Sequence, residues 1–130
     1  MSVEKQLEQN KALVARLIED LFFTQPPRFE TINELVHESY IQHNPAAGQG
    51  REGLREFVQN AMVNATPATL KMHASKRVTV NLIAEGDFVV RQEVREDWML
   101  VDIFRCRDGW LVEHWDALRT GPELGPIPGF

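Results

Sequence analysis

The chain has 130 residues, of which 43% are hydrophobic and 25% are charged, and this composition is typical of one globular domain with its own core. Its net charge of -5, with basic residues scattered along the chain, argues against nucleic acid as the main partner. A single cysteine, Cys106, excludes an internal disulfide framework, and no spacing of Cys and His suggests a zinc site.

The N-terminal residues 1–9 are mostly polar and charged, unlike a secretory signal. No apolar stretch reaches the roughly 18 residues that a membrane-spanning helix needs. These features predict a soluble, cytoplasmic protein with no membrane partner.

The first half of the chain has the spacing of helices. Residues 3–23 are expected to form one, with apolar side chains recurring at helical intervals (Leu7, Val14, Leu17, Ile18 and Leu21) until Pro26 and Pro27 stop it. Short apolar patterns predict further helices over about 28–36 and 51–64. The stretch 37–49 between them is expected to be extended and irregular, partly because a residue before proline avoids the helical region.

From residue 70 onward the apolar period changes to two, which predicts strands at about 70–84, 87–96, 98–106 and 110–118. Helices followed by an antiparallel meander indicate an α+β domain with the helices on one sheet face. One domain is expected to span residues 1–130, with an irregular tail at 121–130.

Three polar residues, Asp102, His114 and Asp116, interrupt the two apolar strands at the end of the sequence. Carboxylates are seldom buried without a partner, so their presence in a core hairpin points to function. A three-residue loop at 107–109 with a bulge at Gly109 would pair Asp102 with His114 and bring all three onto the helix-covered face. A two-residue loop would scatter them, and we prefer the bulged loop.

The bulged loop also has consequences for the opposite sheet face. It leaves four apolar residues there, and a second copy of the chain is expected to cover them as a homodimer: Val101, Ile103, Leu111 and Trp115. A loop of the same form at 84–86 places Arg91, together with Val89 and Glu93, off the helix-covered face.

Several segments together resemble the SnoaL-like polyketide-cyclase family: Tyr40 to Pro45, Gly50 to Leu54, Ala84 to Asp87, Asp102 to Arg105 and Glu113 to Asp116. This family belongs to the superfamily of nuclear transport factor two and ketosteroid isomerase. The resemblance implies a cone-shaped barrel, in which three N-terminal helices pack on a strongly curved, mainly antiparallel sheet that encloses a pocket.

The resemblance also implies a reaction and its residues. Characterised cyclases of the family catalyse an intramolecular aldol closure with neither metal nor cofactor, and their acid/base aspartate corresponds to Asp116. The position of their assisting histidine is occupied by Asp102 in this chain, so the sequence differs from the family pattern there. The imidazole would then come from His114 or His43. Such a superfold hosts many functions, so the fold alone does not establish the reaction.

We therefore expect a cofactor-independent acid/base enzyme that acts on an apolar carbonyl compound, as an aldol cyclase or an isomerase. The expected catalytic residues are Asp116, Asp102 and His114, and the expected substrate-binding residues are Tyr40, His43, Phe57, Phe88, Trp98 and Phe104. No metal or cofactor is expected.

Each assignment has a structural alternative: a carboxylate that bonds backbone amides, a satisfied core histidine, or plain aromatic core. Cys106 is expected to be an inert core residue. Two other functions remain open. The pocket could bind a small hydrophobic molecule without turning it over, or it could hydrolyse an epoxide, as related cone-shaped enzymes do with an Asp-Arg-Asp set. The second is ranked last because Arg91 is expected to face away.

Overall fold

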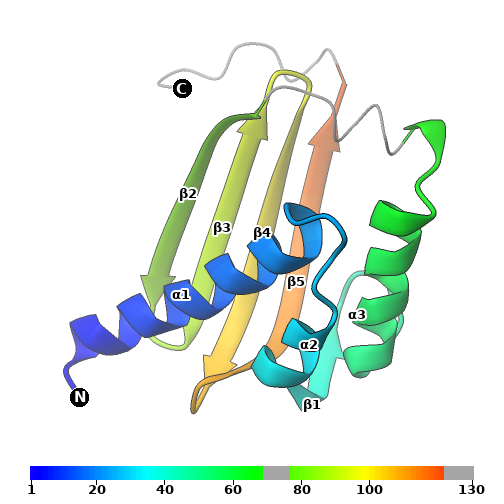
Figure 1. The fold of residues 1–130 in the computed structure, drawn as a ribbon. Coiled ribbons are helices and arrows are strands. Elements are labelled where there is room, and N and C mark those ends of the chain that lie inside the picture. The colour runs from blue at the N-terminus through cyan, green and yellow to red at the C-terminus, as the bar shows by residue number, and fades with distance from the viewer. Residues whose placement is uncertain (69–76, 122–130) are drawn as a thin grey trace.

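The fold consists of helices packed against one face of a five-stranded sheet (Figure 1). The computed structural model describes residues 1–68 and 77–121, except for the side chains of residues 77 and 78. Its elements in chain order are α1 (Val3–Phe22), α2 (Glu30–Leu35), β1 (Val36–Gln42), α3 (Gly50–Val58), the π-helical turn η1 (Gln59–Val63), β2 (Arg77–Glu85), β3 (Phe88–Arg95), β4 (Trp98–Arg107) and β5 (Trp110–Thr120).

The sheet has the order β1-β5-β4-β3-β2, with β1 parallel to β5 and every other pair antiparallel. It is curved and does not close on itself, so helices and sheet together form an open cone. The predicted α+β class and mainly antiparallel sheet are confirmed. The predicted irregular tail lies outside the described residues, apart from Gly121 at its start.

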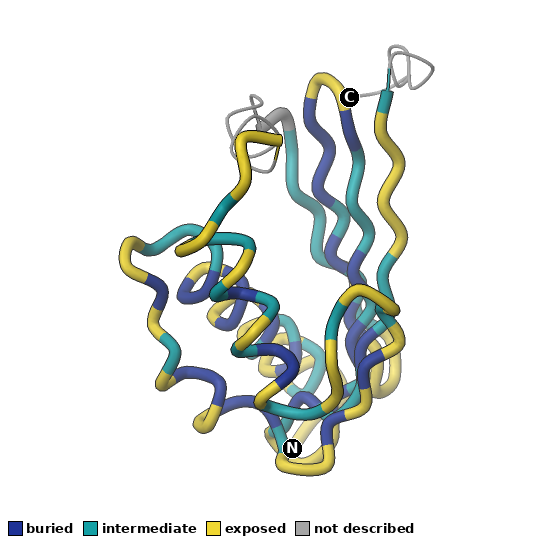
Figure 2. Tube along the Cα trace, turned by 90° about the vertical axis from the view of Figure 1, so that its right-hand side faces the viewer, coloured by how far each residue is buried: buried dark blue, intermediate teal, exposed yellow. Residues whose placement is uncertain are grey.

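Helix α1 follows its predicted pattern closely. Its N-cap residue is Ser2, whose hydroxyl accepts a hydrogen bond from the backbone N–H of Lys5. Val14, Leu17 and Leu21 are fully buried against the sheet, and the buried positions lie where helices and strands face each other (Figure 2). Among the described residues, no helix is long and apolar enough to cross a membrane.

The stretch expected to be irregular includes a strand. Residues 36–42 form β1, which lies beside β5 at the edge of the sheet. The third helix is also shorter than predicted, because its last turns widen into the π-helical turn.

The β4–β5 hairpin uses a two-residue loop, so the preferred register is wrong. Asp108 and Gly109 both have positive φ (51° and 83°), and Arg107 pairs with Trp110. This geometry is that of a type I′ turn, which an Asp-Gly pair adopts readily. A bulge further along the hairpin, where Val112 has no partner, then reverses the parity of β5.

This bulge decides which residues face the helices. Asp102 pairs with Asp116 and Phe104 pairs with His114, so the three polar residues still share one face, as predicted. Leu111 lies on the other side of the bulge and is fully buried in the core. Its predicted place on the outer face is therefore wrong.

The β2–β3 hairpin is also one residue tighter than predicted. Glu85 pairs with Phe88 around Gly86, and Leu82 pairs with Arg91. The odd-numbered residues of β3 consequently face the helices, and Arg91 is 5% exposed. The prediction that Arg91 lies off this face is wrong.

Candidate active site

A cavity of about 660 Å³ lies between the helices and the concave face of the sheet. Pockets for small ligands fall in the range of roughly 300–1,000 Å³. The cavity is lined by apolar side chains and by a group of polar ones from β1, the turn that follows it, β4 and β5: Tyr40, Gln42, Asn44, Asp102, His114 and Asp116. A ligand in this cavity would meet all three predicted catalytic residues.

The centre of the polar group is a contact between Asp102 and His114. Their Oδ1 and Nε2 atoms are 2.8 Å apart, and both side chains are 9% exposed. The ring also packs on Phe104, with centroids 4.6 Å apart. The strand register explains the contact. Asp102 on β4 pairs with Asp116 on β5, and His114 lies two positions before Asp116 on the same face.

Gln42 fixes which atom of the imidazole carries a proton. The Oε1 atom of Gln42 accepts a hydrogen bond from the backbone N–H of Asn44 at 2.9 Å, and the same oxygen lies 2.8 Å from His114 Nδ1. An oxygen that is already oriented as an acceptor requires a proton on Nδ1. The contact between Nε2 and Asp102 must therefore contain a further proton, held on either the imidazole or the carboxyl.

Asp116 is the second carboxylate of the site. Its Oδ2 accepts a hydrogen bond from Asn44 Nδ2 at 2.8 Å and lies 4.0 Å from His114 Nε2. Its side chain is 21% exposed, more than that of Asp102. Asp116 is thus oriented from one side and open to the cavity from the other.

Tyr40 adds a neutral hydroxyl to the wall. Burial raises the pKa of Tyr40, and the negative charge of Asp102 raises it further. The hydroxyl oxygen accepts a hydrogen bond from Gln42 Nε2 at 3.3 Å. The phenol consequently keeps its proton at any physiological pH.

Four of the six predicted binding residues line the cavity: Tyr40, Phe57, Trp98 and Phe104. Phe88 does not, because it is 44% exposed and contacts Trp115 on the outer sheet face. His43 also lies outside, where it stacks on Trp115 and contacts Glu113 Oε2 at 2.7 Å. The predicted pocket positions of Phe88 and His43 are wrong, and so is the possibility that His43 supplies the imidazole.

Sequence reasoning missed two groups of residues. Gln42 and Asn44 flank His43, and strand alternation would have placed them inward once His43 faced outward. Arg91, Glu93 and Arg95 also line the cavity, and their period-two spacing was the available signal.

Within the described part of the chain, Asp102, His114 and Asp116 could hold a divalent cation, because their ligand atoms lie within 4.8 Å of one another. A proton on Nδ1 that is donated to Gln42 would direct Nε2 toward such an ion. An ion and the proton between Nε2 and Asp102 would compete for the same place.

The helices, the open cone of sheet and the polar group inside it define a protein of the superfamily of nuclear transport factor two and ketosteroid isomerase. The profile of the SnoaL-like domain matches residues 14–114. The chain therefore belongs to the SnoaL-like domain family, as its sequence predicted. No curated protein matches it in sequence.

Three solved structures show the same fold. A protein of Jannaschia sp. CCS1, provisionally described as a SnoaL-like polyketide cyclase, is 22% identical over 85% of each chain, with a TM-score of 0.64. AclR of Streptomyces galilaeus, provisionally described as a hydroxylase, is 18% identical over 91% of this chain and 83% of its own, with a TM-score of 0.63.

The third is a protein of Kribbella flavida DSM 17836, provisionally described as a ketosteroid isomerase. It is 21% identical over 95% of this chain and 85% of its own, with a TM-score of 0.57. At these identities the likeness establishes the fold and leaves the reaction to be argued from the site.

Proposed function

We propose that this chain is a cofactor-independent enzyme that performs general acid/base chemistry on an apolar carbonyl compound, of the aldol-cyclase or isomerase type. The observation that carries the proposal is the 2.8 Å contact between Asp102 Oδ1 and His114 Nε2 beside the open carboxylate of Asp116. A base and a proton donor that face one cavity are what enolisation requires.

In this proposal Asp116 is the base. It takes a proton from a carbon beside the carbonyl, and the electron pair of that C–H bond moves onto the carbonyl oxygen. The proton held between Asp102 and His114 passes to the oxygen that becomes negative. In an isomerisation, the proton on Asp116 then returns to a different carbon and the enol proton returns to the pair.

In an aldol closure the first oxygen instead stays an unprotonated enolate and becomes a carbonyl again as the α-carbon attacks a second carbonyl. The proton of the pair then passes to the oxygen of that second carbonyl, which takes up the electron pair. Asp116 afterwards returns its proton to the pair through one water molecule, because Oδ2 and Nε2 are 4.0 Å apart and make no direct hydrogen bond, so no net proton is consumed. Tyr40 lies on the same wall as a neutral hydrogen-bond donor to a carbonyl oxygen.

The test is proton exchange, which needs no knowledge of the natural substrate. The probe is 2-tetralone in D₂O, and its α-hydrogen exchange is followed by NMR. Asp116→Asn should lower the enzyme-dependent exchange rate by roughly 10²–10⁴-fold. The control is Glu113→Gln, the same carboxyl-to-amide change on the outer side of β5, which should leave the rate unchanged.

An exchange rate that survives Asp116→Asn would remove Asp116 from the proposed role. Exchange that requires added Zn²⁺ and stops with a chelator would assign Asp102, His114 and Asp116 to a metal instead.

The alternative is a protein that binds a small hydrophobic molecule without turning it over. The apolar part of the cavity wall supports it equally well. Such a binder should retain its ligand affinity in Asp116→Asn and show no exchange with any carbonyl probe.

A third possible function is epoxide hydrolysis, and the observed strand register favours it more than the predicted one because Arg91 faces the cavity. Arg91, Asp102 and Asp116 are direct cross-strand neighbours on the concave face. However, the ion pair of Arg91 is with Glu93, at 2.8 Å, and not with either aspartate. Incorporation of ¹⁸O from labelled water into the diol of styrene oxide would support this reaction.

We also propose that the outer sheet face forms a homodimer. Val101, Ile103 and Trp115 are half-buried there, and Ile83, in the same cross-strand row as Ile103, is 60% exposed. A contiguous apolar surface favours covering by a partner. Sedimentation should give a dimer at micromolar concentration and a monomer for Ile103→Lys, whereas a monomeric wild-type protein would contradict the proposal.

A further inference from the structure

Strand β3 carries three charged side chains on its concave face: Arg91, Glu93 and Arg95. They are 5%, 2% and 7% exposed. Residues two apart on a strand share a face, so the three form one row that lines the cavity. Within this row two guanidinium groups contact the carboxylate of Glu93.

Glu93 divides its two carboxylate oxygens between the arginines. Oε1 accepts from Arg91 Nη1 at 2.8 Å, and Oε2 accepts from Arg95 Nε at 2.7 Å. Each contact therefore uses a single N–H of the guanidinium. A guanidinium has five N–H groups in a planar fork, and it normally uses two of them to bind one carboxylate.

The remaining donors of Arg91 face open space. Within the described parts of the chain, Glu93 is the one hydrogen-bond acceptor that Arg91 meets. No fully buried side-chain nitrogen or oxygen in those parts lacks a partner, so Nε and Nη2 of Arg91, which meet no acceptor, must each touch a cavity. Arg91 lines both the 660 Å³ cavity and an adjoining one of about 440 Å³ beside α1.

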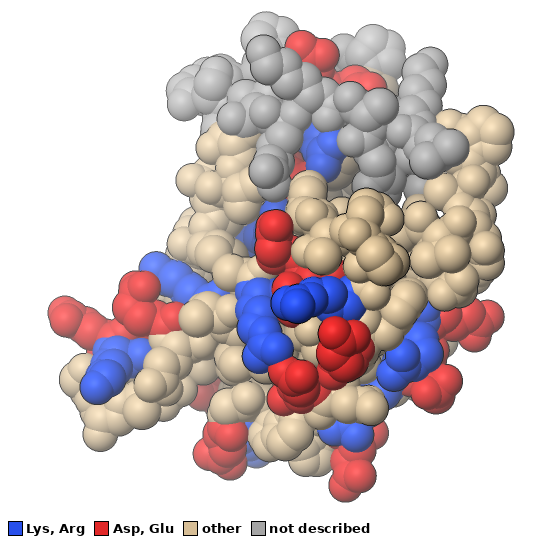
Figure 3. All heavy atoms as spheres, in the orientation of Figure 1, with Lys and Arg blue, Asp and Glu red and all other residues tan. Residues whose placement is uncertain are grey.

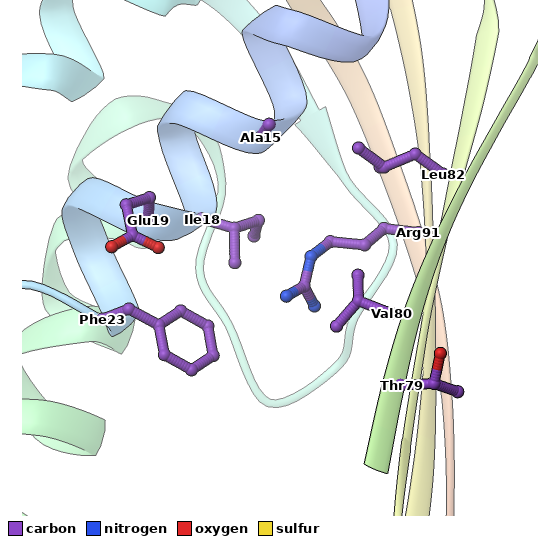
Figure 4. A pocket seen from close by; sticks show the side chains of 8 residues that line it. All are labelled: Ala15, Ile18, Glu19, Phe23, Thr79, Val80, Leu82 and Arg91. Carbon is purple, nitrogen blue, oxygen red and sulfur yellow. The ribbon is translucent and has the colours of Figure 1, made fainter. Parts of the chain in front are cut away.

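Figure 4 shows the guanidinium projecting from β3 toward α1, beside Ile18 and Phe23. Its Cζ atom lies 5.8 Å from the centroid of the Phe23 ring. Glu19 of α1 is exposed and lies on the far side of Ile18 in this view. Over the face shown in Figure 3, acidic and basic side chains are interspersed.

A buried cation with unused donors is costly unless an anion completes it. We propose that the ligand of this cavity carries a carboxylate, which binds the free edge of Arg91, and an apolar body that lies along Trp98 and Phe104. The inference deepens the proposed function, on which it rests for the idea that the cavity holds a substrate.

The charges of the cavity would also orient such a ligand. Arg91 lies on β3, directly across from Asp102 on β4, and Asp116 follows on β5. With a shared proton, the Asp102–His114 pair has no net charge and does not attract an anion. The carboxylate of Asp116 would repel one. The carboxylate would therefore lie on the β3 side, with the reacting carbonyl on the β5 side.

Isothermal titration with two matched probes tests the proposal. The acid is 2-naphthoate, and the neutral control is 2-naphthamide, which has the same rings. In the wild-type protein the acid should bind roughly 10- to 100-fold more tightly, as a charge-assisted hydrogen bond implies. In Arg91→Gln this preference should fall to about twofold or less, while the affinity for the amide stays unchanged and shows that the cavity is intact.

The matched control is Arg105→Gln on the outer face, which should keep the full preference. If Arg91→Gln does not fold, Arg91→Lys keeps the charge but loses the fork, and naphthoate affinity alone should drop by about tenfold. Equal wild-type affinities, no binding of naphthoate, or a preference that survives both Arg91 substitutions would overturn the proposal.

These binding results are independent of the proton-exchange test. Preference for the acid without exchange of 2-tetralone would refute the proposed catalysis alone. Exchange that needs Asp116, without any preference for the acid, would refute the carboxylate inference alone.

Discussion

Replacement of Asp102 by Asn tests the proposed proton between Asp102 and His114, whose Oδ1 and Nε2 atoms are 2.8 Å apart. Asn has the same shape as Asp, so the packing around position 102 is kept. In a neutral ring whose proton Gln42 holds on Nδ1, Nε2 is an acceptor, and the new amide would donate its own N–H to it. In that arrangement the contact holds no proton that could pass to a substrate oxygen.

The expected energies follow from the burial of the pair, whose side chains are both 9% exposed. A hydrogen bond to a charged group contributes about 1.5–3 kcal/mol and a neutral one about 0.5–1.5 kcal/mol. Asp102→Asn should therefore lower the free energy of unfolding by about 1 kcal/mol. Asp102→Ala leaves the imidazole without its partner and should cost about 3 kcal/mol.

The assay is NMR of protein with ¹⁵N-labelled histidine. The wild-type protein should show a strongly downfield proton coupled to His114 Nε2, and Asp102→Asn should lack it while losing at least about 10² in 2-tetralone exchange. Asp87→Asn, the same change in an exposed turn, should alter neither. A wild-type protein without the bridging proton, or an Asn variant that retains it, would refute the reasoning.

Gly53→Ala should destabilise the fold by about 1–3 kcal/mol, since the new Cβ would lie 2.1 Å from the carbonyl of Gly48; an unchanged urea midpoint would contradict this close approach. The hydrogen bond from His43 is the largest cause that lowers the pKa of Glu113 from its ordinary 4.5. The stability that this hydrogen bond adds is present above pH 4.5 and is lost as the pH falls through the folded-state pKa of Glu113. Glu113→Gln should therefore flatten the acid limb of a plot of melting temperature against pH, and an unaltered limb would argue against the contact. Burial raises the pKa of Cys106 to about 11, so a disulfide reagent at pH 8 should label the unfolded chain only, and rapid labelling of the native protein would show that the thiol is accessible.

The sequence predicted the elements whose signals are local. The apolar spacing of α1 and the proline stop after it were sufficient for that helix. Asp102, His114 and Asp116 were found because polar residues stand out in strands that otherwise form a core. The cone-shaped arrangement of helices and sheet was predicted from the family resemblance, because local sequence patterns do not show how the elements pack together.

The errors arose where one residue of register decides a face. The loop length of the last hairpin depends on whether Asp108 tolerates a left-handed backbone, and its bulge depends on packing around Leu111. A one-residue slip exchanges the two faces of a strand, so the same error hid Arg91. The pairing of β1 with β5 joins segments about seventy residues apart and leaves no local pattern.

The departure from the family pattern at Asp102 now has a physical reading. The position that corresponds to the family's assisting histidine carries a carboxyl here, and in the proposed mechanism the imidazole is that of His114 on the neighbouring strand. Because the two side chains hydrogen-bond, the cavity still receives an ionisable pair beside Asp116. The exchange makes Gln42 and Asn44 part of the site, since one fixes the proton on the relocated ring and the other orients the open carboxylate. Gln42→Leu should therefore disturb the position and the Nδ1 proton of the His114 ring while it leaves Asp102 and Asp116 unchanged. This variant separates the effect of the ring's position from the effect of the neighbouring carboxylates.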